Sequence, residues 1–406
     1  MAIASLMLRV LILVLVLSVG PASAQTTWYV DANATPPGNG SASQPYTSLV
    51  YAMQQASSQS GDTFLVAPGT YAPPAGLPYL FLYLLTIRGT AGAAATRISG
   101  EMQLTDGSTL EGFSVEGTVS MAIAAKLRRC VVFCPTGDCH GAGQRAVFVD
   151  DYATVEHCVL SGYHSGIVMF AFATTTAQIR NTIVLDVNEV ASFHTDAHFD
   201  HCALPRIPNG PLLTATGTVL GDPGVWDSLH HDYHLRPGSP CIDAGIGNDP
   251  DGTPADIGTF PYDPSYCPEP VSYCTSKLNS AGCTPSIGST GLPSASAGSG
   301  FVITTTNEVE NKFGKHYYST TGASNAPFQG GFLCLEPPLV RTPVQNSGGT
   351  SPCGGVYMID FNAYIASGKD PSLVPGQQVW VQTWSRDPAS PSTTSLSDAL
   401  SFTICP

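Results

Sequence analysis

Four short stretches decide the fold of this chain: Leu127-Arg128-Arg129-Cys130, Val155-Glu156-His157-Cys158, Ile179-Arg180-Asn181-Thr182 and Phe199-Asp200-His201-Cys202. Each has an apolar residue, two polar residues and then a small or sulfur-bearing residue. They recur at intervals of about 20 to 28 residues, which is the length of one solenoid coil. One coil cannot bury its inward face, whereas stacked coils bury a continuous column. The spacing predicts a right-handed parallel β-helix.

A second column of strands supports this interpretation, at residues 146–149, 167–170 and 190–193. Equivalent residues of successive coils should lie about 4.8 Å apart. Cys130, Cys158 and Cys202 would then form a ladder inside the solenoid. We expect these three to be free, buried thiols that behave as small apolar side chains.

The N-terminus has the pattern of an export signal. Arg9 precedes an unbroken apolar run at residues 10–17, and Ala22-Ser23-Ala24 has the small-x-small pattern of a cleavage site. These features predict a signal peptide over residues 1–24 and a secreted or cell-surface protein beginning at Gln25. The apolar run is short and no later stretch is apolar enough to span a bilayer, so we expect no transmembrane segment after cleavage.

Cysteine content and charge limit the compartment and the partners. The chain has 12 cysteines, which in an exported protein predict disulfides, mainly among the six that follow residue 265. Those six allow 15 connectivities, and the sequence does not choose among them. The net charge of -14 excludes nucleic acid as an expected partner. The same negative charge disfavours a polyanion such as pectate as a ligand, unless a metal ion bridges the protein and the polyanion.

The two ends of the solenoid carry the most specific motifs. The first is Trp28-Tyr29-Val30-Asp31, followed by a helix with Ser48 as its N-cap and by Pro68-Gly69-Thr70-Tyr71. The second runs from Gly221-Asp222-Pro223 to Asp256-Ile257-Gly258. Together they resemble secreted bacterial β-helix proteins of the pectin-lyase-like class. This resemblance covers residues 27 to about 262 and implies a fold more than a function.

The amino-acid composition changes after Tyr262, where a proline-rich linker begins. We therefore expect a β-helix domain over residues 25–265 and a β-rich module over residues 266–406. Short strands are predicted in the module at residues 300–306, 331–335, 355–361 and 377–384, typical of a small disulfide-linked β-sandwich. The module resembles C-terminal modules appended to other exported bacterial proteins.

Four residues form the candidate catalytic set: Asp150, Asp151, His164 and Arg180. They resemble the site of the polygalacturonase-type glycoside hydrolases, which implies acid and base roles for the two aspartates, a supporting role for His164 and substrate binding by Arg180. Paired carboxylates suit glycoside cleavage, since one protonates the leaving oxygen while the other activates water. Alternatives are a lyase that uses an arginine as its base, and a solvated Asp-Asp turn with no catalytic role.

Two segments are candidate metal sites. Asp249, Asp251 and Asp256 surround a glycine turn and offer the hard oxygen ligands that calcium prefers. The alternative is a structural turn in which these side chains bond local amides. The alternating His and Asp residues at 194–201 suit a transition metal if they share one strand face, and are otherwise an exposed face of an ordinary strand.

The candidate ligand site of the second module is Trp380, Gln382 and Trp384. Alternate residues of a strand share a face, so two tryptophans would flank one amide in a sugar-stacking platform. Packing between sheets is the alternative. The sequence as a whole favours a non-catalytic exported protein that contacts extracellular polysaccharide or serves a surface-architecture role, with no required cofactor. The alternative is a polysaccharide-degrading hydrolase or lyase.

Overall fold

The computed structural model describes residues 25–55, 61–73, 79–82, 84–136, 139–169, 176–192, 196–208 and 213–406. The chain divides into two compact units, one ending at Tyr262 and the other spanning Asp263–Pro406. The predicted signal peptide lies outside the described residues. In the described part of the chain, no helix is both long and apolar enough to cross a membrane.

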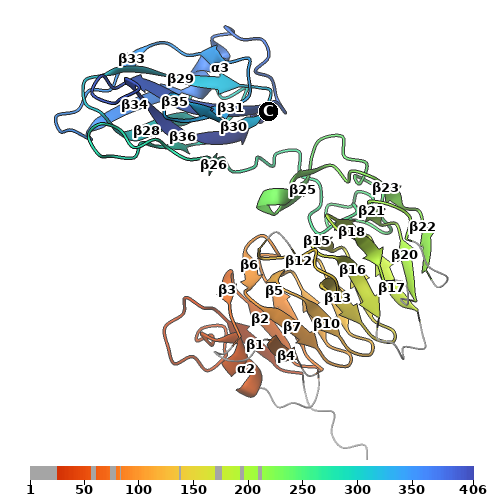
Figure 1. Cartoon of the computed structure of the whole chain (residues 1–406). Helices are drawn as coiled ribbons and strands as arrows, with labels where there is room; N and C mark the ends of the chain where they lie inside the picture. The colour runs from red at the N-terminus through yellow and green to blue at the C-terminus, as the bar shows by residue number, and fades with distance from the viewer. Residues whose placement is uncertain are drawn as a thin grey trace, which may run out of the picture. The chain divides into compact units, whose positions relative to one another are not determined.

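The first unit is a right-handed parallel β-helix, as predicted, built from three parallel sheets (Figure 1). The first sheet contains β1 Thr27–Val30, β2 Thr63–Val66, β5 Thr86–Gly89, β8 Thr109–Glu111, β11 Lys126–Arg128, β14 Thr154–Glu156, β17 Ala177–Arg180, β20 Ala197–Asp200 and β22 Leu213–Thr216. The second contains β3 Gly69–Tyr71, β6 Thr96–Ile98, β9 Ser114–Glu116, β12 Val131–Phe133, β15 Val159–Ser161, β18 Ile183–Leu185, β21 Ala203–Leu204 and β23 Val219–Leu220. The third contains β4 Tyr79–Leu82, β7 Glu101–Leu104, β10 Val119–Met121, β13 Arg145–Val149, β16 Ser165–Met169 and β19 Glu189–Ala191.

The four-residue motif marks the corner between the first and second sheets. Its third residue takes a left-handed backbone conformation in each coil, with φ between 47° and 50° at Arg129, His157, Asn181 and His201. That conformation turns the chain sharply between two strands. The fourth residue then points inward, which explains why it is small: Cys130, Cys158, Thr182 and Cys202 are fully buried.

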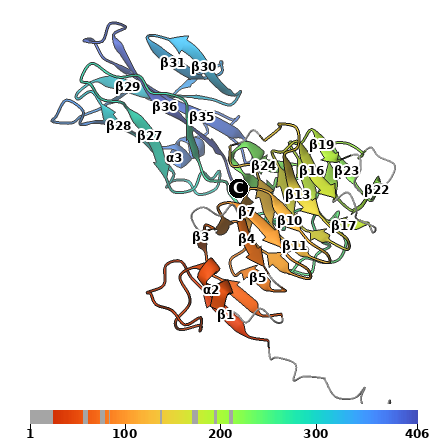
Figure 2. The ribbon, with the colours of Figure 1, turned by 60° about the horizontal axis from the view of Figure 1, so that its bottom comes forward.

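One apolar column runs through the coils. Register pairs Leu127 with Val155, Val155 with Ile179 and Ile179 with Phe199, and all four side chains are buried. The predicted capping helix is present as α2, Leu49–Gln55, with Leu49 and Ala52 buried in the same core. The hydroxyl of Ser48 accepts a hydrogen bond from Tyr51 N, as expected of an N-cap. Figures 1 and 2 both place α2 beside β1.

The outer face of the second sheet is covered by the end of the unit. β24 Val225–Asp227 and β25 Asp232–Leu235 form a hairpin around the short helix η1, Ser228–His230. The hairpin and residues 241–262 pack against apolar side chains that point away from the coil interior. This second core contains Val131, Phe133, Val159, Ile183, Leu185, Tyr233, Leu235, Cys241 and Ile257.

The second unit is a β-sandwich of antiparallel sheets. Its main sheet contains β26 Val271–Tyr273, β36 Thr394–Thr403, β35 Gln378–Arg386, β29 Phe313–Ser319, β32 Val340–Arg341 and β33 Gln345–Asn346. A second sheet contains β27 Ser286–Thr290, β28 Val302–Glu308 and β34 Gly355–Asp360, followed by α3 Phe361–Ala366. A hairpin of β30 Ala323–Phe328 and β31 Gly331–Leu335 completes it.

Disulfides are concentrated in the second unit, as expected. They join Cys267 to Cys405, Cys274 to Cys334 and Cys283 to Cys353, and a fourth joins Cys134 to Cys139 in the β-helix. Cys130, Cys158 and Cys202 are free and buried, as predicted, and so is Cys241. The β-helix core therefore uses thiols as small apolar groups.

Candidate functional site

The candidate catalytic residues of the β-helix lie at separate corners of the coil. Asp150 and Asp151 follow β13, between the third and first sheets, and Asp151 N donates to the Asp150 carboxylate at 2.8 Å. His164 precedes β16, between the second and third sheets. Arg180 ends β17, beside the corner between the first and second sheets. A strand rises about 3.3 Å per residue, so strands of three to five residues hold these corners roughly 10 Å or more apart.

His164 belongs to contacts between neighbouring coils. Its Nδ1 lies 3.1 Å from His140 O and 3.1 Å from the amide nitrogen of Asn188. Its Nε2 lies 3.9 Å from a Glu189 carboxylate oxygen. These partners come from the coils on either side, so the ring links coils at this corner and does not face Asp150 or Asp151.

Arg180 belongs to a row of alternating charge on the first sheet. Register aligns Arg88, Glu111, Arg128, Glu156, Arg180 and Asp200 on consecutive strands. Glu156 lies 3.3 Å from the Arg128 guanidinium and 3.8 Å from that of Arg180. Arg88 and Glu111 pair at 2.9 Å. The arginines of this row therefore have glutamate partners along the wall, with Arg128 and Arg180 sharing Glu156.

The three aspartates of the candidate calcium site bind backbone amides. Asp256 accepts hydrogen bonds from Asp243 N at 2.7 Å and Tyr262 N at 2.5 Å, and Asp249 accepts one from Asp256 N at 2.8 Å. Asp251 accepts from Thr253, and these bonds lower the pKa of its carboxyl. Burial raises the pKa of Asp249, whose other oxygen lies 3.7 Å from Arg129. Four of these carboxylate contacts are hydrogen bonds within the turn, and Asp249 Oδ1 is buried with no hydrogen-bond partner among the described residues.

No group of three or more His, Cys, Asp or Glu side chains among the described residues is arranged to hold a metal ion. In the row at 194–201, residues 194 and 195 lie outside the described part of the chain. His198 Nδ1 lies 2.8 Å from the Thr214 hydroxyl, and His201 Nδ1 lies 2.9 Å from the Asp200 carboxylate. These side chains bond neighbouring residues on the sheet.

A cleft of about 400 Å³ lies beside the closing hairpin, and the sequence analysis did not anticipate it. Trp226 lines it together with three carboxylates that already have partners. Asp222 pairs with Arg236 at 2.8 Å, Asp227 with His230 at 2.6 Å, and Asp186 accepts from the Ser161 hydroxyl at 3.3 Å. Asp222 and Asp227 therefore serve the hairpin and the residue that follows it, whereas Asp186 links neighbouring coils.

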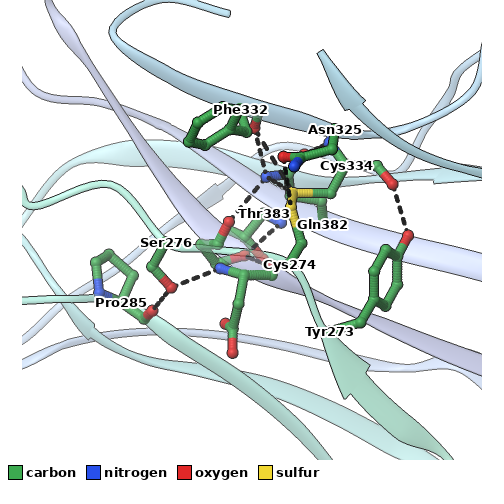
Figure 3. Close-up of a disulfide and its surroundings, with 11 residues drawn as sticks. Tyr273, Cys274, Ser276, Pro285, Asn325, Phe332, Cys334, Gln382 and Thr383 are labelled. Atoms are coloured by element: carbon green, nitrogen blue, oxygen red, sulfur yellow. Dashed lines mark hydrogen bonds between the residues drawn. A yellow bond between two sulfur atoms is a disulfide. The ribbon is translucent and has the colours of Figure 1, made fainter. Parts of the chain in front are cut away.

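In the second unit, Gln382 does not present its amide to solvent. It is 1% exposed, lies beneath the β30–β31 hairpin, and accepts a hydrogen bond from Cys334 N at 3.1 Å. Its amide nitrogen donates to Phe332 O at 3.0 Å and Ser397 O at 2.8 Å, beside the Cys274–Cys334 disulfide (Figure 3). The expected platform of Trp380, Gln382 and Trp384 is therefore interrupted at its centre.

Trp384 instead pairs with Tyr317, which the sequence analysis missed. The two rings are stacked, with centroids 6.2 Å apart and planes inclined by 23°. The Trp384 indole N–H donates to the Gln329 side chain at 2.9 Å. Both rings are partly exposed on the outer face of β29 and β35. β29 was not predicted, although Phe313, Lys315 and Tyr317 alternate with residues that are buried, which is the signal that marks a half-buried strand.

No family model and no curated protein matches this chain. Among solved structures, the chain is similar to the crystal structure of pectate lyase Pel9A, at 12% identity and a TM-score of 0.28, over 59% of this chain and 97% of that chain. A rhamnogalacturonan lyase is similar at 9% identity and a TM-score of 0.27, over 57% of this chain and 95% of that chain. The fold described above rests on the strand registers.

Proposed function

We propose that this protein is exported and binds extracellular polysaccharide, without catalysis, through the outer face of β29 and β35. The observation that carries the proposal is the stacked pair Tyr317 and Trp384. Aromatic rings at a surface offer an apolar face beside a polar edge, which suits contact with sugar rings. The hydrogen bond from Trp384 to Gln329 orders one ring before a ligand arrives, which lowers the entropy cost of binding.

The β-helix fits the role of a scaffold in this proposal. Its candidate catalytic groups lie at three corners, and Arg180 has Glu156 as an ionic partner. Four disulfides suit an oxidising compartment outside the cytoplasm. The alternative, a glycoside hydrolase or polysaccharide lyase acting on the β-helix wall, would require a set of residues other than Asp150, Asp151, His164 and Arg180 acting together.

The test uses the mature chain in gels that contain neutral or acidic polysaccharides, where binding retards migration. We expect retardation by at least one polysaccharide and its loss in Tyr317→Ala and Trp384→Ala. Trp380→Ala is the matched control, because Trp380 is a partly exposed tryptophan of the same strand and is not stacked on Tyr317. Retardation lost equally in the control would contradict the placement of the site.

Catalysis is tested on the same panel by measuring new reducing ends and the ultraviolet absorbance of unsaturated products. We expect neither to accumulate. Product formation would overturn the non-catalytic proposal, and its loss in Asp151→Asn would place the active site on the middle coils.

A further inference from the structure

We infer that the ligand of this face is an anionic polysaccharide, whose carboxylate or sulfate groups bind a row of three cations beside Tyr317 and Trp384. The row consists of Lys315, Arg341 and Arg386, and we call it the cationic row. This inference rests on the proposed function and names the class of polysaccharide.

Strand register places the cationic row and the aromatic pair on one face. Lys315 lies directly opposite Trp384, and Tyr317 lies directly opposite Arg341. Arg386 is two residues beyond Trp384 on β35 and therefore shares its face. The Arg341 guanidinium lies over the Tyr317 ring, 5.7 Å from its centroid. Strand spacing of about 4.8 Å spreads the row over roughly 10 Å across β35, β29 and β32, enough to contact more than one sugar of a chain.

The cations of the row lack carboxylate partners. Among the residues that the structure describes, none of the three forms an ion pair within 4.0 Å, and the ion pairs all fall in the β-helix. There, Arg88 pairs with Glu111, and Arg128 and Arg180 share Glu156. The same side-chain type is thus neutralised on the wall of the first unit and left free on this face of the second.

The strands that form the face carry no carboxylate, as their sequences show. Two of the nearby acids, Asp387 and Glu308, point inward, whereas Glu336, which follows β31, is exposed. Asp387 is fully buried and binds the N–H and hydroxyl of Ser280, and Glu308 is fully buried and bonds the Ser385 hydroxyl. The strands of this face therefore carry positive charge although the chain as a whole is acidic. The net charge of the chain thus does not predict which ligand charge this face would bind.

Stacking rings flanked by cations match a sugar chain with regularly spaced anionic groups. The rings supply apolar contact and the row supplies charge-assisted hydrogen bonds, for which guanidinium groups are well shaped. A nucleic acid would also offer stacking and negative charge. The proposed export places the protein among extracellular polysaccharides, and the experiment below includes a single-stranded oligonucleotide to distinguish the two classes.

The experiment measures binding of the mature full chain to fluorescent oligosaccharides by anisotropy, at low and high salt. The probes are oligogalacturonate, a sulfated dextran oligomer, neutral oligogalactan and single-stranded oligothymidylate. We expect binding to an anionic sugar that weakens with salt, because exposed charges are screened. Replacing all three cations (Lys315→Gln, Arg341→Gln, Arg386→Gln) should weaken it by roughly tenfold or more, and each single change by about two- to fivefold. Arg180→Gln is the matched control and should bind like the wild type.

The outcomes separate this inference from the proposed function. Preference for oligogalacturonate or for the sulfated dextran identifies the anionic group, and either supports the inference. Equal binding of oligogalactan and oligogalacturonate, unaffected by the triple variant, would overturn the inference and leave polysaccharide binding intact. Preferential binding of oligothymidylate, or no binding of any sugar, would overturn both.

Discussion

The side-chain amide of Asn181 forms two hydrogen bonds with the backbone of Ile246, which is 65 residues further along the chain. Its oxygen accepts from Ile246 N at 2.8 Å, and its nitrogen donates to Ile246 O at 2.9 Å. The Asn181 side chain thus bonds the N–H and C=O of Ile246 as a neighbouring strand would. It thereby links the closing segment, residues 241–262, to the middle coils. The amide nitrogen also lies 3.0 Å from His157 Nε2, in the coil before it.

Asn181→Ala should lower the free energy of unfolding of the β-helix by about 2 to 4 kcal/mol. The change removes two partly buried hydrogen bonds to the backbone of Ile246 and places alanine in a left-handed conformation that asparagine tolerates better. Urea unfolding followed by circular dichroism measures it. His201→Ala, at the same corner of the next coil, should cost less than about 1 kcal/mol because His201 bonds only residues of its own and the following coil. Equal losses would argue against the special role of Asn181.

Gln382→Leu should destabilise the second unit by about 3 kcal/mol. Leucine has a similar size but leaves Cys334 N, Phe332 O and Ser397 O without their partner in a buried site. Gln378→Leu makes the same substitution at the exposed start of the same strand and should change stability little. Thermal unfolding of the intact, oxidised chain distinguishes the two variants, and similar melting temperatures would be evidence against the buried network.

Pairing between the cysteines predicts the number of reactive thiols. Burial raises the pKa of Cys130, Cys202 and Cys241 to about 12 and raises that of Cys158 as well, so all four remain protonated and unreactive in the native protein. Titration with a thiol-specific chromogenic reagent should give almost no reaction in native buffer, and four thiols per chain in denaturant without reductant. Full reduction should release all 12. A count of fewer than four in denaturant would indicate an additional disulfide.

Glu308 predicts a pH dependence of stability. Burial is the main cause that raises the pKa of its carboxyl from 4.5 to about 7 in the folded chain. Because the folded state holds this proton more tightly, the contribution to stability is full below about pH 4.5 and is lost as the pH rises to 7. Glu308→Gln removes the loss, so the variant should exceed the wild type by about 3 kcal/mol at pH 7.5 and by little at pH 4.5.

The test compares the difference in unfolding free energy between Glu308→Gln and the wild type at the two pH values. The stability of the wild type alone is not enough, because His316 changes it with pH in the opposite direction. Burial lowers the pKa of His316 from 6.5 to about 4, so its contribution is lost as the pH falls from 6.5 to 4. Glu310→Gln, two residues from Glu308 and partly exposed, is the control for removal of one carboxylate. A gain in stability that is the same at both pH values would contradict the assignment to Glu308.

Much of the β-helix could be predicted because its signals are local and repeated. The corner motif specifies an inward apolar residue, a sharp turn and a small buried residue in each coil, as at Leu127, Arg129 and Cys130. The second sheet was harder to anticipate. Its residues are buried on both faces, as at Val131, Val132 and Phe133, so the alternation that reveals a strand is absent.

The candidate sites depended on contacts that the sequence does not encode locally. Alternation along β35 correctly put Trp380, Gln382 and Trp384 on one face, but the hairpin that covers Gln382 comes from residues 323–335. Tyr317 reaches Trp384 only because β29 and β35 are neighbours in the sheet. Likewise, the aspartates of residues 249–256 have the composition of a calcium loop, and only the fold shows that backbone amides donate to Asp256 and to one oxygen of Asp249.

The sequence by itself determined the coil period, the capping helix and the free thiol column, because each depends on residues within one coil and its repetition. The tertiary structure alone decided which charges are paired. Arg180 and Arg341 are equally basic as residues, yet register sets Glu156 beside the first and an aromatic ring beneath the second. Coulombic partners are fixed by distances of a few ångströms between strands, and strand neighbours arise only when the whole chain has folded.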